Sequence, residues 1–288
     1  MNRVFFVTYA DDRAGRKEGK YVRTQKFISE FLTHNRDFGI TNQLHFNFDH
    51  YSRSDVFLRN AHWQSDPVPD NNGRCYKPWA IKQALDSANM GDFIIYNDCS
   101  EEHWRHLCTL PQKSGINSPP SRINPNTHSI VVLKEMCCRN KGILTTYVSV
   151  PPYNGINHDP MSNSHDHEHY TLDSCMDAMN MRKYAKSFQH ASGLIVLQKN
   201  NESIQFVNEW LHYNQVPACA TLEAWGEEHH KKMGHRTDQS ISGLLINNIN
   251  NDLVIQHDFD AIRPYNFLSL CAMRHPYSFI SSNYKISL

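Results

Sequence analysis

The sequence predicts an α/β fold, and two features support this prediction. Short apolar runs of strand length alternate with segments in which apolar residues recur every three or four positions, the spacing of an amphipathic helix. The segment 76–101 contains a complete helix–turn–strand unit that ends in polar residues. Because α/β domains often reach 288 residues and no internal repeat interrupts the chain, we expect one domain over 1–288 with an insertion-rich second half.

The N-terminal part of the chain shows a β-α-β alternation. The apolar run 4–9 predicts a buried strand, residues 27–32 predict a helix that stops near Gly39, and 43–48 predict a second strand. A further helical stretch is expected from His50. The loop after the first strand contains neither GxGxxG nor GxxxxGK[ST], so neither a dinucleotide-binding fold nor a P-loop is supported.

The unit 76–101 predicts a helix that starts with Pro78 at its first position and stops at Gly91. A buried strand is expected at 93–96, and it ends in Asn97 and Asp98. The carboxyl ends of strands in an open parallel sheet face the ligand crevice, so Asp98 is well placed to hold a metal or a substrate. An alternative is that Asp98 only caps a neighbouring helix.

The second half alternates less regularly. The proline-rich segment 111–128 is typical of a surface loop, and the polar segment 151–169 is expected to be another loop. Further elements are predicted as a helix at 130–137, strands at 143–150 and 193–198, a helix at 202–213 with Asn201 as N-cap, and a helix capped by Thr237.

Composition excludes several classes of protein. Lysine plus arginine equals aspartate plus glutamate at 29 each, so no global field attracts nucleic acid or an anionic membrane surface. The eight cysteines lack CxxC spacing and are expected to be reduced thiols. Neither a signal peptide nor a run of eighteen apolar residues is visible, so we expect a cytoplasmic protein without a membrane-spanning segment.

Three patterns resemble one family. GRCYKPWAIKQAL followed by GDFIIYNDCS resembles the Gly-x-x-Tyr-x-x-Lys-Pro, helix, Gly-Asp, strand, Tyr-x-Asp unit of nucleotide-sugar-dependent glycosyltransferases of the GT-A fold. SFQHASGLIVLQKNNESIQFVNEWL is similar to their Gln-x-Ala, strand and helix segment, and GHRTDQSISGLLI is similar to their Arg-x-Asp-Gln-Ser helix start. The resemblance implies a Rossmann-like mixed sheet flanked by helices, with a nucleotide-sugar-binding half at 1–101 and an acceptor-side half at 102–288.

The resemblance also implies a divalent cation, Mn²⁺ or Mg²⁺, that neutralises the departing diphosphate. Both ions prefer oxygen ligands, and Asp98 matches the family's acidic motif. The motif is reduced from Asp-x-Asp, because the neighbours of Asp98 are Asn97, Cys99 and Ser100. Glu101 or His235 would therefore complete the site, or the enzyme depends only weakly on metal.

The same resemblance implies that the donor nucleotide sugar contacts residues at the ends of strands and at the beginning of the helix that precedes the strand 93–96. Lys77 would assist the diphosphate as a point charge, although a solvated lysine is an equal alternative, and Tyr9 could equally belong to the core. The full set of predicted nucleotide-sugar contacts is Thr8, Tyr9, Ala10, Lys77, Asn97, Asp98, Gln189, His190 and Ala191.

Asp238 and Gln239 are the predicted catalytic residues. In an inverting enzyme Asp238 would take the proton from the acceptor hydroxyl, and in a retaining enzyme the pair would flank the anomeric carbon. The alternative is that Asp238 only caps its helix. The next candidate bases are Glu227, Glu228 and Asp173.

The histidine-rich run around His165, His167 and His169 allows a zinc site, but we favour a loop over 151–170 that orders when donor or acceptor binds. These patterns are compatible with two functions. The first is transfer of a sugar from a UDP- or GDP-sugar to a glycan or other hydroxyl acceptor. The alternative is a non-catalytic nucleotide- or glycan-binding protein on the same scaffold.

Overall fold

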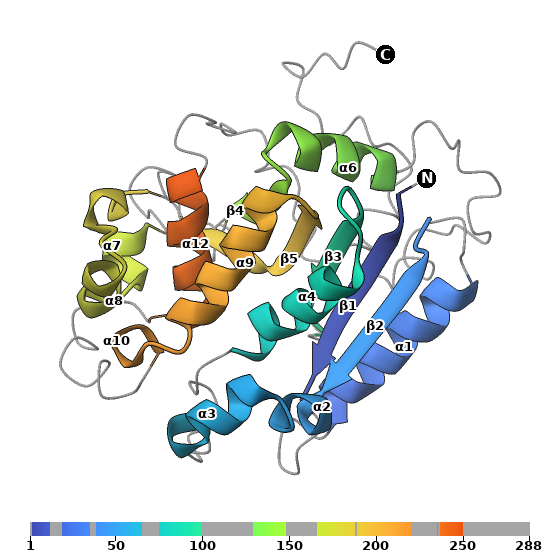
Figure 1. Cartoon of the computed structure of the whole chain (residues 1–288), viewed down its shortest axis with the longest axis horizontal. Coiled ribbons are helices and arrows are strands. Elements are labelled where there is room, and N and C mark those ends of the chain that lie inside the picture. The colour runs from blue at the N-terminus through green and yellow to red at the C-terminus, as the bar shows by residue number, and fades with distance from the viewer. Residues whose placement is uncertain are drawn as a thin grey trace, which may run out of the picture.

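The computed structural model describes residues 2–11, 19–34, 39–64, 75–99, 129–147, 166–187, 189–220, 235 and 237–249. Within these residues the chain forms one five-stranded mixed sheet with helices on both faces (Figure 1). This confirms the α/β class and the mixed sheet.

The first half of the described chain contains β1 (Val4–Ala10), α1 (Lys20–His34), β2 (Asn42–Asn47), α2 (Phe48–Ser52), α3 (Asp55–Gln64), α4 (Tyr76–Ser87) and β3 (Phe93–Asn97). The second half contains α6 (Ser129–Arg139), β4 (Ile143–Tyr147), α7 (His167–Tyr170), α8 (Asp173–Ala178), the 3₁₀ helix η5 (Arg182–Tyr184), β5 (His190–Gln198), α9 (Asn201–Tyr213), α10 (Pro217–Ala220) and α12 (Thr237–Ile249).

The strands lie in the order β2-β1-β3-β5-β4. Strand β1 is parallel to both β2 and β3, whereas β5 is antiparallel to β3 and to β4. The carboxyl ends of β1 and β3 therefore lie at the same edge of the sheet as the amino end of β5. This edge collects residues from three strands that are distant in the sequence.

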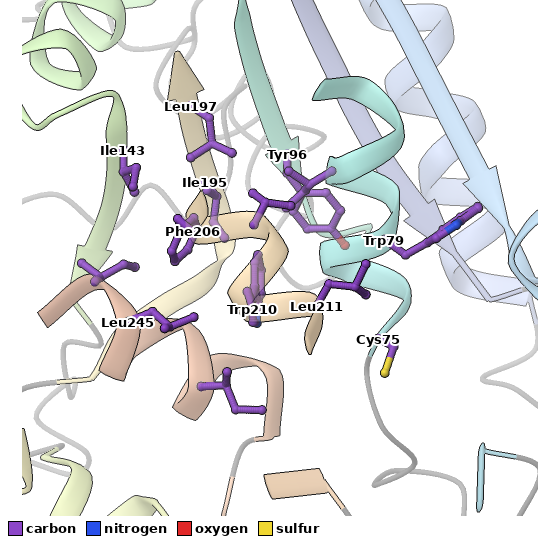
Figure 2. Close-up of a cluster of buried hydrophobic side chains, with 14 of the residues drawn as sticks. Cys75, Trp79, Tyr96, Ile143, Ile195, Leu197, Phe206, Trp210, Leu211 and Leu245 are labelled. Carbon is purple, nitrogen blue, oxygen red and sulfur yellow. The ribbon is translucent and has the colours of Figure 1, made fainter. Parts of the chain in front are cut away.

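Successive residues of each strand point to opposite faces of the sheet, so the hydrophobic core has two parts, one on each face. On one face α4, α9 and α12 cover the sheet, and on the other face α1 and α6 do so. Figure 2 shows the first part, where Phe206 and Trp210 of α9 lie beside Leu245 of α12 and the sheet residues Ile195 and Tyr96. Both Trp210 and Tyr96 are almost fully buried, so this face provides rigid support for polar groups at its edge.

Several element boundaries differ from the sequence predictions. Cys75 precedes α4, so Pro78 is its third residue, still inside the first turn where an N–H has no helical partner. Helix α4 ends at Ser87, before Gly91, which instead lies in the turn to β3 with φ +87° and donates its N–H to the carbonyl of Lys199. Gly91 has this role because positive φ has no steric cost for glycine.

The N-cap of α9 is Asn200 and not Asn201. The side chain of Asn200 accepts the backbone N–H of Ser203 at 2.8 Å, and the Ser203 hydroxyl accepts the N–H of Asn200 at 3.1 Å. This is a reciprocal capping box, which satisfies two backbone donors at the helix start. The neighbouring asparagines explain the error, because either one has the residue type that suits a cap.

No helix in the described part of the chain combines the length and apolar character needed to cross a membrane.

Candidate functional site

The edge formed by the ends of β1 and β3 and the start of β5 holds a buried ion-paired cluster, here called the Lys77 cluster, which consists of Lys77, Tyr96, Asp98, Ser192 and Asp238. These side chains come from α4, β3, the residue after β3, β5 and the first turn of α12. No stretch of sequence contains more than part of the set, so the fold assembles it.

Lys77 is the centre of the cluster, and its side chain is only 3% exposed. Its Nζ atom lies 2.9 Å from Oδ2 of Asp238 and 3.2 Å from Oδ2 of Asp98. It also donates to the hydroxyl of Ser192 at 3.0 Å and to the carbonyl of Ser192 at 3.2 Å. Burial lowers the pKa of Lys77, but the carboxylates of Asp238 and Asp98 outweigh that effect and raise it above the ordinary lysine value.

Asp98 is the member of the cluster that reaches the surface, because 27% of its side chain is exposed. The hydroxyl of Tyr96 donates to Oδ1 of Asp98 at 2.9 Å, while Lys77 donates to Oδ2. The backbone N–H of Asp98 donates to the carbonyl of Gly193 at 2.9 Å. Both the backbone and the carboxylate of this residue are therefore held in a fixed orientation.

Asp238 lies in the first turn of α12, as expected, but its side chain is fully buried. The Ser192 hydroxyl donates to Oδ2 of Asp238 at 2.9 Å, and the indole N–H of Trp210 donates to its backbone carbonyl at 2.8 Å. Ser192 reaches this position beside a register shift between β4 and β5: Thr145 pairs with Ile195, whereas Thr146 pairs with Ala191. Such irregularities change the direction in which a strand residue points.

The predicted donor contacts on β1 lie inside the protein. Thr8 is buried, and its hydroxyl is 2.7 Å from Nδ1 of His45 and accepts from the amide of Gln25 at 3.0 Å. Tyr9 belongs to the core and stacks on Tyr76 with ring centroids 4.1 Å apart, which matches the core alternative. Ala10 is also fully buried. A direct contact of these side chains with a ligand would require the surrounding packing to open.

Asn97 is likewise buried and helps to hold the strand end. Its side-chain amide donates to the carbonyl oxygens of Asp98 and Gly193 at 3.2 and 3.3 Å. It supports the backbone beside Asp98 rather than presenting its side chain outward.

Of the predicted sugar contacts, Gln189 precedes β5, whereas His190 and Ala191 are the first two residues of that strand. Gln189 belongs to a buried hydrogen-bond network. The amide of Gln189 donates to the hydroxyls of Thr171 and Ser240, and its Oε1 accepts from Gln239 at 3.1 Å. Gln239 itself is half-buried. The backbone of Ala191 pairs with Thr146 of β4. Through the hydrogen bond between Gln239 and Gln189, this network connects α12 to the residue that precedes β5.

His190 belongs to a second buried polar chain. Its Nδ1 is 2.8 Å from the hydroxyl of Thr145, and its Nε2 is 3.3 Å from Oδ1 of Asn247, whose amide is 3.3 Å from Nε2 of His167. Burial lowers the pKa of His190 to about 4 and that of His167 to about 3. Both imidazoles are therefore neutral near pH 7.

His235, the predicted second metal ligand, is hydrogen-bonded to backbone groups through both of its ring nitrogens. Its Nδ1 accepts the N–H of Leu172 at 3.3 Å, and its Nε2 lies 2.8 Å from the carbonyl of Cys219. Burial lowers the pKa of this imidazole to about 4. A neutral imidazole has one acceptor nitrogen and one donor nitrogen, and both are engaged here, so the geometry does not offer His235 to a cation.

The histidine-rich run is helical where the structure describes it. His167 is buried in the short helix α7, with Nδ1 2.8 Å from the hydroxyl of Thr171, whereas His169 is exposed and pairs with Asp166. The idea that these histidines share one strand face is therefore wrong for this pair, because both lie in α7; His165 lies outside the described residues. Among the described residues, no group of three His, Cys, Asp or Glu is arranged to hold a metal.

Of the remaining candidates, Asp173 begins α8 and pairs with Arg182 at 3.7 Å, away from the hydrogen bonds of the Lys77 cluster. Glu101, Glu227 and Glu228 lie outside the described residues, as do residues 151–165 of the predicted loop. The remainder of that predicted loop is helical at 167–170, where it forms α7.

Sequence reasoning missed Ser192, Tyr96 and Trp210 as parts of the site. Ser192 lies inside the second family-like pattern, directly after Ala191, and Tyr96 is two residues before Asp98 on the same side of the strand. The period of two along a strand could have pointed to Tyr96. Nothing in the sequence indicates that Trp210 donates to the backbone of Asp238.

Comparison with known proteins gives no further indication of identity: no protein-family model, no curated protein and no solved structure matches the chain.

Proposed function

We propose that this chain is a glycosyltransferase that moves a sugar from a nucleotide-diphosphate sugar to a glycan or other hydroxyl acceptor. One observation carries the proposal: each of the three segments that resemble GT-A glycosyltransferases contributes to the Lys77 cluster. The first segment supplies Lys77 and Asp98, the second supplies Ser192, and the third supplies Asp238. Three independent resemblances in sequence thus meet in one set of hydrogen bonds.

The charge of the cluster supports a role for a cation. One ammonium faces two carboxylates, so the cluster has one excess negative charge when both are ionised, and Asp98 exposes part of it. Mg²⁺ typically keeps several waters and takes one or two carboxylates together with substrate phosphates, so Asp98 suits such an ion. Asp98 would hold the cation, which when bound neutralises the charge that develops on the leaving diphosphate. Tyr96 and Lys77 hold the carboxylate in place.

The direct test is donor hydrolysis. Purified protein is incubated with a panel of UDP- and GDP-sugars and Mn²⁺, and release of UDP or GDP is measured. We expect slow hydrolysis of at least one donor, and its loss in the variant Asp98→Asn. The matched control is Asp86→Asn, because Asp86 is an exposed carboxylate of α4 whose partner is Lys82 of the same helix.

The second candidate is a nucleotide- or glycan-binding protein without catalysis. It is favoured by the burial of Asp238. Asp98 is then the one carboxylate of the Lys77 cluster with exposed surface, so the cluster offers no second accessible carboxylate as a base. Clear binding of UDP or GDP without hydrolysis of any donor in the panel would support this second function and contradict the first.

A further inference from the structure

We infer that Asp238 is a positioning residue: its buried carboxylate fixes the ammonium of Lys77, and Lys77 together with Tyr96 fixes Asp98. The inference rests on the proposed function only in taking Asp98 as the group that faces the donor and its cation. It differs from the sequence-based hypothesis in which Asp238 removes the acceptor proton.

The surroundings of Asp238 argue against direct contact with an acceptor. Its side chain has no exposed surface, and its Oδ2 atom already accepts from both Lys77 and Ser192. A general base must come within hydrogen-bond reach of the proton that it removes. Reaching Asp238 would require the acceptor to displace the packed groups around it, whereas Asp98 is accessible without such a change.

The hydrogen-bonding capacity of Lys77 points the same way. An ammonium has three N–H donors, and Lys77 has four acceptor atoms within 3.2 Å, on Asp98, Ser192 and Asp238. Every donor is therefore engaged inside the protein. Lys77 acts on a ligand through Asp98, and its orientation depends on the anchored carboxylate of Asp238.

Asp238 is itself anchored from two other elements. Ser192 of β5 donates to its carboxylate, and Trp210 of α9 donates to its backbone carbonyl. Trp210 is fully buried against Phe206 and the sheet (Figure 2). Helix α9 and strand β5 thus hold Asp238 in place. Asp238 fixes Lys77, and Lys77 in turn orients the carboxylate of Asp98.

The first test measures coupling by thermal unfolding and needs no substrate. The variant Lys77→Met leaves two carboxylates without their cation and should lower Tm strongly. Adding Asp238→Asn removes the buried negative charge, so the double variant should melt above Lys77→Met. Lys82→Met is the control, because it breaks an exposed pair with Asp86 on the same helix and should change Tm little. A double variant that melts below Lys77→Met would overturn the inference.

The second test separates positioning from proton transfer. Titration of Mn²⁺ in the presence of UDP should show that Asp238→Asn and Tyr96→Phe each weaken Mn²⁺ binding, by about 10- to 100-fold as is usual when a group that orients a ligand is removed. Asp86→Asn should bind Mn²⁺ like the wild type. If Asp238→Asn keeps wild-type Mn²⁺ affinity and loses about 10²- to 10⁴-fold in turnover, Asp238 is a base and the inference fails.

The two proposals fail in different ways. A wild-type protein that hydrolyses no donor contradicts the proposed glycosyltransferase, while the unfolding measurements still decide whether Asp238 and Lys77 are coupled.

Discussion

Gly243 of α12 lies against the imidazole of His167 so closely that a Cβ atom at position 243 would be 2.9 Å from Cε1 of the ring. The same Cβ would be 3.2 Å from the backbone nitrogen of His190. The absence of a side chain at Gly243 is therefore what allows α12 to approach both α7 and β5, and through them the polar chain of buried histidines.

We expect Gly243→Ala to destabilise the protein. Alanine improves helix propensity by about 1 kcal/mol, but an extra methyl group in a packed interior typically costs about 1–3 kcal/mol. The net loss should be measurable by urea unfolding. A free energy of unfolding equal to or above that of the wild type would show that the ring of His167 shifts at little cost.

Stability should fall as the pH decreases below about 6.5, the ordinary histidine pKa. Burial lowers the pKa of His167 to about 3 and the pKa values of His190 and His235 to about 4, so the unfolded chain binds protons that the folded chain does not. Each such histidine contributes a slope of about 1.4 kcal/mol per pH unit between its two pKa values. Urea unfolding at about pH 7 and about pH 5 measures this loss.

The control for the pH experiment is the variant His190→Gln, which removes one of the three titrating groups. Its stability should depend less steeply on pH than that of the wild type over the same range. Equal slopes in the two proteins would mean that His190 does not titrate differently in the folded and unfolded states.

The variant Asp98→Asn should fold normally and lose donor hydrolysis. Asp98 is partly exposed, and Lys77 keeps Asp238 and Ser192 as partners when the Asp98 charge is removed. We therefore expect the variant to lose less stability than Lys77→Met, which breaks both ion pairs of the cluster and should cost about 3–5 kcal/mol in the free energy of unfolding. Urea unfolding and nucleotide release from the donor panel, run on the same preparation, check both parts. Full hydrolysis by this variant would exclude Asp98 from the site.

Asn200→Ala should destabilise the protein by about 0.5–2 kcal/mol, because it removes the capping box of α9. The amide of Asn200 also donates to the carbonyl of Lys141 at 3.0 Å, which adds to the effect. Asn201→Ala is the matched control and should change stability by less than about 0.5 kcal/mol. The reverse order of these two effects in chemical denaturation would place the N-cap at Asn201.

Local patterns in the sequence predicted much of the fold. The helix that carries Phe206 and Trp210 and the strand 93–96 were predictable because their apolar periodicity reflects burial on one face or on both. The direction of β5 was not predictable, because it is set by antiparallel pairing with β3 and β4, and no local pattern in the sequence encodes this pairing. The boundary between β2 and α2 also moved, since Phe48 is equally suited to end a strand or begin a helix.

The candidate site was predictable in its residue types but not in its contacts. The patterns that resemble glycosyltransferases pointed to Lys77, Asp98 and Asp238, and the structure brings these three together. The burial of Asp238 was not predictable, because it depends on Trp210 and Ser192, which come from other elements. The proposed donor, cation and reaction stay predictions, which donor hydrolysis and Mn²⁺ titration test.

The assembly of the Lys77 cluster from α4, β3, β5 and α12 has a consequence for folding. Until β5 and α12 dock, the ammonium of Lys77 stays hydrated, and its burial is unfavourable without the carboxylate of Asp238. Contacts between segments so far apart in the chain close large loops and form late. A chain in which Lys77 is shielded from solvent has therefore docked β5 and α12 beside α4 and β3, and the chemical reactivity of this one amine reports that docking.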